Sequence, residues 1–162
     1  MFMYVGTYTA TGQPGRGRAE GIYVYRLDPD TAELTHLHTV PDVPNPSFLA
    51  AHPGGAFLYA VNEGLETRDQ PRGAVSAFAR DPEGGNLTFL NHELSHGTDP
   101  CHLTVDREGR CVLVANYTSG SVAVLPIGAD GRVGPASFVD QHSGASVNPR
   151  RPLCARRLRL PR

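Results

Sequence analysis

The chain has 162 residues and a formal net charge of −1, with 40% hydrophobic and 19% charged residues. This balance gives no reason to expect a nucleic acid or an anionic membrane as partner. No window approaches the roughly 18 apolar residues of a membrane span. The N-terminus lacks the basic and long apolar regions of a signal peptide, and the three cysteines include no Cys-x-x-Cys pair. We therefore expect a cytoplasmic protein with reduced thiols, no metal site and no cofactor.

Short β-rich runs follow one another along the whole chain. They lie in segments 3–7, 21–25, 34–37, 46–62, 73–78, 87–90, 100–116, 120–125 and 133–139, and segments 46–62 and 100–116 each hold two runs. Tight-turn sequences separate them, for example Asp28-Pro29-Asp30, Pro53-Gly54-Gly55 and Ala129-Asp130-Gly131. This alternation of strand-like runs and turns predicts an all-β fold.

The runs repeat with an offset of 54 residues. Segment 46–62 aligns with segment 100–116, and a glycine opens the next run in both units, at Gly73 and Gly120. A repeat of about 50 residues with four short strands is typical of a β-propeller blade. Runs such as 111–115 are apolar on both faces, which suits a sheet packed between neighbouring sheets. A two-sheet β-sandwich is the alternative, but it would not explain why the units align over all four strands.

We therefore expect a partial β-propeller of four-stranded antiparallel blades over residues 1–149. Blade one covers 1–40 and lacks its first strand, blade two covers 46–93 and blade three covers 100–142. The C-terminal end of a longer chain would supply the missing strand and close the ring. Residues 150–162 break the pattern, because six of the thirteen are Arg. We expect an aberrant and disordered tail, read out of frame or from a truncated gene end; a basic arm for nucleic acid or lipid is the alternative.

Several segments resemble the seven-bladed β-propeller lactonase family, whose bacterial members include 6-phosphogluconolactonases. They are Tyr4–Thr9, Leu58–Glu63, Asp99–Asp106 and Val114–Val122, and His142–Arg151 is similar to the stretch that leads into blade four. The resemblance implies about three of an expected seven blades. It also implies a lactone hydrolase that converts 6-phosphogluconolactone to 6-phosphogluconate in the pentose phosphate pathway. Family members continue with Pro-His-x-His-Ser, whereas Pro152-Leu153-Cys154 stands here, so we expect this chain alone to be inactive.

A lactonase needs a base that activates water and a donor for the developing oxyanion, and a phosphosugar also needs a cation. His102 begins the predicted first strand of blade three, where blade two has Phe48, so the blade framework does not require a histidine there. His142 lies in a Gly/Ser-rich link between blades. We expect both histidines to be catalytic; a structural role for His102 and an exposed loop position for His142 are the alternatives.

The expected substrate-binding residues are Asn148, Arg150 and Arg151, because the planar guanidinium fork of Arg suits a phosphate. Asn62 and Asn116 share one repeat position, which favours a turn-capping role over a catalytic one. The expected partner is a small sugar lactone, with self-association through open blade faces and without nucleic acid or membrane. A non-catalytic propeller that serves as a binding scaffold is the alternative function, because the fold does not fix the activity.

Overall fold

The computed structural model describes residues 1–9, 17–66 and 71–142, and its regular elements there are β-strands. They are β1 (Phe2–Val5), β2 (Gly21–Leu27), β3 (Leu34–Pro41), β4 (Leu49–Ala51), β5 (Phe57–Glu66), β6 (Pro71–Arg80), β7 (Leu87–Leu94), β8 (Pro100–Val105), β9 (Cys111–Asn116), β10 (Ser121–Pro126) and β11 (Phe138–Gln141). In this part of the chain no helix has the length and apolarity needed to cross a membrane. The expected tail at 150–162 lies outside the described residues.

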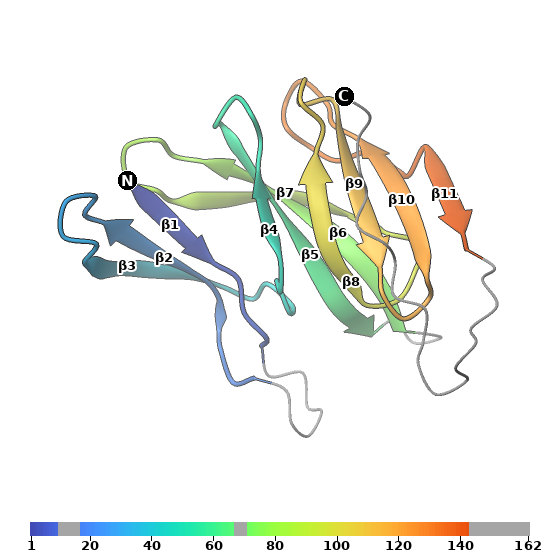
Figure 1. Ribbon diagram of the computed structural model, residues 1–162, viewed down its shortest axis with the longest axis horizontal. Helices are drawn as coiled ribbons and strands as arrows, with labels where there is room; N and C mark the ends of the chain where they lie inside the picture. The colour runs from blue at the N-terminus through green and yellow to red at the C-terminus, as the bar shows by residue number, and fades with distance from the viewer. Residues whose placement is uncertain (10–16, 67–70, 143–162) are drawn as a thin grey trace.

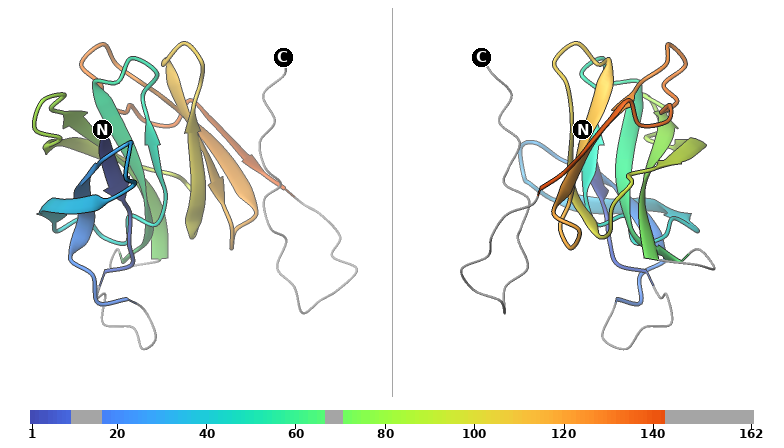
Figure 2. Two further views of the ribbon diagram at one scale, coloured as in Figure 1. Left: turned by 60° about the vertical axis from the view of Figure 1, so that its left-hand side comes forward. Right: turned by 90° about the vertical axis from the view of Figure 1, so that its right-hand side faces the viewer.

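The strands form three sheets in which each strand pairs with its neighbours in the chain. The sheet orders are β1-β2-β3, β4-β5-β6-β7 and β8-β9-β10-β11, and adjacent strands are antiparallel. We call these sheets blade one, blade two and blade three. They stand side by side (Figure 1), and a turned view shows the same succession of sheets (Figure 2). The predicted all-β fold with four-stranded antiparallel blades is confirmed.

The hydrophobic core is divided between the two blade interfaces. Blade two packs against blade one through a cluster that includes Ile22, Leu58 and Phe78. Its other face packs against blade three through a larger cluster that includes Tyr59 and Leu103. The first strands β4 and β8 contact each other, so they form the shared inner edge of blades two and three. Apolar side chains on both faces of a strand are therefore explained by one blade on each side.

One contact between blades occurs twice. The Tyr4 hydroxyl donates a hydrogen bond to the Gly85 carbonyl oxygen at 3.0 Å, and the Tyr59 hydroxyl donates to the Gly131 carbonyl oxygen at 3.1 Å. Both glycines have a left-handed backbone, with φ of 75° and 80°. A Cβ atom on Gly131 would also lie 2.2 Å from the Phe57 ring, so only glycine fits. We call each tyrosine–glycine contact a blade lock.

The repeated asparagines tie the loop that enters each blade to the strands. Asn62 donates from Nδ2 to the Pro44 carbonyl oxygen at 2.8 Å, and its Oδ1 accepts a bond from Ser76 at 2.6 Å. Asn116 donates to the Ser95 carbonyl oxygen and to Ser121 Oγ, both at 3.1 Å, and accepts from Ser95 Oγ at 2.7 Å. Both side chains are fully buried. Their structural role is confirmed.

Candidate functional site

Polar and aromatic side chains gather at one end of the blades, where β4 and β8 begin and β5 and β9 end. Pro100 at the start of β8 lies opposite Asn116 at the end of β9. In blade two, the Glu63 amide donates to the Asn45 carbonyl oxygen at 3.2 Å, just before β4. We call this end the mouth. The residues of interest there are Tyr8, Ser47, Phe48, Glu63, His102 and Tyr117.

His102 lies on the inner strand at the mouth, as its repeat position predicts. A β-bulge between Pro100 and His102 places His102 opposite Ala115, and a bulge redirects the side chains that follow it. The half-buried imidazole packs against the Phe48 ring of blade two, with ring centroids 4.6 Å apart and an interplanar angle of 47°. Within the described residues its ring nitrogens have no hydrogen-bond partner. Both nitrogens are therefore available to a ligand or a water molecule.

His142 follows β11, the strand farthest from β8 in blade three. Its Nδ1 lies 3.6 Å from Asp140 Oδ2, and half of each of the two side chains is exposed. Three strand spacings separate β11 from β8, which corresponds to about 14 Å. The structure therefore does not bring His102 and His142 together. The other predicted site residues, Asn148, Arg150 and Arg151, lie outside the described residues.

Glu63 is the mouth residue whose environment the sequence did not indicate. Its side chain is buried, with 7% of the residue exposed. The Tyr8 hydroxyl lies 3.0 Å from Oε1 and 3.1 Å from Oε2, and Ser47 Oγ donates to Oε1 at 2.5 Å. Among the described residues no cationic side chain forms an ion pair with this carboxylate. Comparison of the repeats is the signal that could have singled out Glu63. The equivalent position of blade three holds Tyr117, so the repeated framework does not require a carboxylate there.

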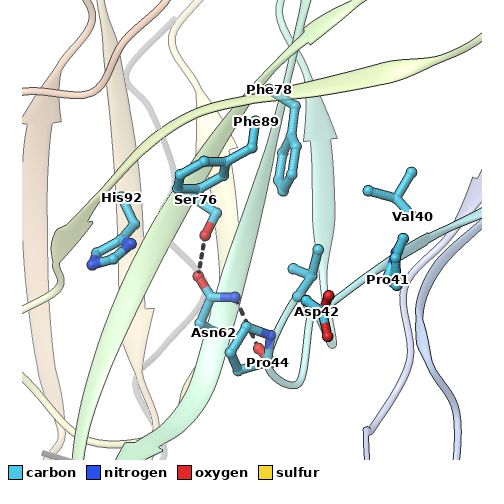
Figure 3. Close-up of a pocket in the computed structure, with 10 residues that line it drawn as sticks. Val40, Pro41, Asp42, Pro44, Asn62, Ser76, Phe78, Phe89 and His92 are labelled. Atoms are coloured by element: carbon cyan, nitrogen blue, oxygen red, sulfur yellow. Dashed lines mark hydrogen bonds between the residues drawn. The ribbon is translucent and has the colours of Figure 1, made fainter.

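A pocket of about 380 Å³ opens between blades one and two (Figure 3). Phe78 and Phe89 of blade two and the connection from β3 to β4 form much of its wall. At one end Ser76 bonds to Asn62, which bonds to Pro44, so these polar atoms are already paired. The lining residues are Val40, Pro41, Asp42, Val43, Pro44, Asn62, Ser76, Phe78, Phe89 and His92.

The mouth is a better candidate for chemistry than this pocket. The pocket is predominantly apolar and is lined mainly by the β3–β4 connection and by β6 and β7, toward the outer edge of blade two. No mouth residue lines it. The mouth instead combines an imidazole without a hydrogen-bond partner in the described part of the chain with a buried carboxylate. Hydrolysis of an ester needs groups of this kind.

Comparison with known proteins agrees with the geometry. A family model described as lactonase, 7-bladed beta-propeller, matches residues 2–155. The 6-phosphogluconolactonase of Bacillus subtilis is 35% identical over 91% of this chain and 39% of its own length. A Bacteroides fragilis protein provisionally named 6-phosphogluconolactonase has a solved structure with a TM-score of 0.80 and 41% identity, over 93% of this chain and 38% of that one.

A second solved structure, the periplasmic gluconolactonase of Pseudomonas aeruginosa, has a TM-score of 0.77 and 32% identity. The match covers 90% of this chain and 40% of the Pseudomonas aeruginosa chain. The chain thus spans about two fifths of the length of these relatives. The family model covers nearly all of the sequence, including the mouth residues. The chain therefore belongs to the seven-bladed β-propeller lactonase family.

Proposed function

We propose that the complete protein hydrolyses a sugar lactone, with 6-phosphogluconolactone as substrate and 6-phosphogluconate as product. The observation that carries this proposal is the family match over residues 2–155, supported by relatives named 6-phosphogluconolactonase. The chain spans 39% of the Bacillus subtilis relative, so the activity is proposed for the complete protein.

In this proposal His102 is the general base. An imidazole is suited to this task because its ordinary pKa lies close to neutral pH. A ring nitrogen takes a proton from water while the water oxygen bonds to the lactone carbonyl carbon. The resulting tetrahedral intermediate collapses, the bond from the carbonyl carbon to the ring oxygen breaks, and the proton passes to that oxygen. Phe48 contacts the imidazole ring, and neither ring nitrogen has a hydrogen-bond partner among the described residues.

The remaining proposed residues act on the phosphate end of the substrate. Arg150 and Arg151 bind the phosphate through charge-assisted hydrogen bonds, with Asn148 beside them as a donor. His142 precedes this segment in the chain but lies three strands from β8. We therefore assign the proton transfer from water to His102 alone.

The test is the variant His102→Ala in a chain completed with the further blades of the Bacillus subtilis relative. We expect kcat for 6-phosphogluconolactone to fall by about tenfold or more, as for loss of a general base. His36→Ala is the matched control, because His36 is an exposed histidine on β3. Circular dichroism checks that both variants fold. Unchanged turnover in a folded His102→Ala protein would refute the assignment, and a completed protein that binds the lactone without hydrolysing it would favour a binding scaffold.

A further inference from the structure

The geometry points to a subsite for a polyhydroxylated ring at the mouth, formed by Ser47, Phe48 and Glu63. In this subsite the Phe48 ring packs under the C–H face of the ligand, and the Glu63 carboxylate accepts hydrogen bonds from its hydroxyl groups. The inference rests on the proposed function and deepens it, because it states which residues bind the sugar part of the substrate.

Phe48 is the apolar part of the subsite. Its residue is 37% exposed at the start of the inner strand, whereas the core residue Phe78 of the same blade is fully buried. Packing of the blade does not require a phenylalanine at this place, since the equivalent residue of blade three is His102. The Phe48 ring contacts the His102 imidazole, with ring centroids 4.6 Å apart. An exposed ring held in this way gives a sugar ring a rigid apolar surface close to the proposed base.

Glu63 is the polar part of the subsite. A carboxylate can accept about four hydrogen bonds. The described residues supply two donors, the single hydroxyl protons of Tyr8 and Ser47. Burying a charge costs free energy unless hydrogen bonds or an opposite charge compensate it. Because no cation pairs with Glu63 in the described part of the chain, further hydroxyl donors from a ligand would lower this cost.

The apolar and the polar part are joined through Ser47. Ser47 and Phe48 are consecutive residues, and Ser47 Oγ is 2.5 Å from Glu63 Oε1. An aromatic surface bordered by a carboxylate and by hydroxyl groups matches a sugar ring, which has apolar C–H faces and hydroxyl donors around its edge. The equivalent positions of blade three hold Cys101, His102 and Tyr117, so the repeated framework accounts for none of the three residues.

The test measures the binding of methyl β-D-glucopyranoside to the 162-residue chain by saturation-transfer NMR. This probe is a stable polyhydroxylated ring without a lactone bond. We expect saturation of its ring C–H protons, and a rise in Kd of about fivefold or more in Phe48→Leu, the size expected for one lost aromatic contact. Glu63→Gln keeps the shape of the side chain and removes its charge, and we expect a similar rise there.

Two matched controls keep the test specific. Phe138→Leu changes a phenylalanine that is 55% exposed on β11, and Glu83→Gln changes an exposed glutamate in the turn between β6 and β7. Neither should alter Kd, and circular dichroism should show all four variants folded. Absence of saturation in the original chain, or an unchanged Kd in folded Phe48→Leu and Glu63→Gln, would overturn the inference. Because the probe cannot be hydrolysed as a lactone, binding without activity in the completed protein would refute the proposed function and leave the subsite standing.

Discussion

Replacement of Asn116 by alanine should destabilise blade three strongly. The fully buried amide makes three side-chain hydrogen bonds, two with Ser95 and one with Ser121. At about 1 kcal/mol for each net hydrogen bond, the free energy of unfolding should fall by about 3 kcal/mol. That is a large share of the roughly 5–15 kcal/mol that holds an ordinary domain together.

Urea unfolding followed by circular dichroism measures this loss. Asn86→Ala is the control, because Asn86 is exposed and its amide makes a single long bond of 3.4 Å to Asp81. The control should change the free energy of unfolding by no more than about 0.5 kcal/mol. A loss below about 1 kcal/mol for Asn116→Ala would refute the reasoning, since the buried partners would then find other hydrogen bonds at little cost.

Two further predictions concern pH and assembly. Burial, with a smaller contribution from Asp130, raises the pKa of Tyr59 to about 12, above the ordinary tyrosine value of about 10. The neutral Tyr59 hydroxyl therefore contributes stability that is fully present below pH 10 and is lost as pH rises through about 12. Urea midpoints between pH 9 and 12 should therefore fall less steeply in Tyr59→Phe, and equal slopes would contradict this. The 162-residue chain should self-associate in analytical ultracentrifugation, because β11 exposes Phe138 and Val139. Apolar surface left in water costs about 25 cal/mol per Å². A monomer at all concentrations would exclude this self-association.

The fold could be predicted from the sequence because its signals are local and repeated. Turn residues such as Gly54 and Asp130 lie in the connections between strands, and the offset of 54 residues shows that the units are alike. The same alignment predicts one shared structural position for Asn62 and Asn116. Because strands that follow one another in the chain pair with each other, few other orders of strands are possible.

The site could be predicted only in part, because its contacts join residues far apart in the chain. The repeat predicted that His102 begins an inner strand, but not the bulge that directs it or the ring of Phe48 beside it. Tyr8 and Glu63 are 55 residues apart, and neither is unusual in its own segment. Nor does the loop position of His142 show that it follows β11, three strand spacings from the β8 strand that carries His102.

The blade locks have a consequence for how such a chain can change during evolution. Tyr4 bonds to Gly85 and Tyr59 bonds to Gly131 in the same way. Both blade interfaces therefore contain the same tyrosine–glycine contact. Loss of one 54-residue unit by recombination would bring Tyr4 to Gly131 with the same chemistry. Tyr8, however, would then meet Tyr117 in place of Glu63, and the carboxylate would be gone. Such a loss would therefore keep this contact between blades, whereas the chemistry at the mouth depends on which blades stand side by side.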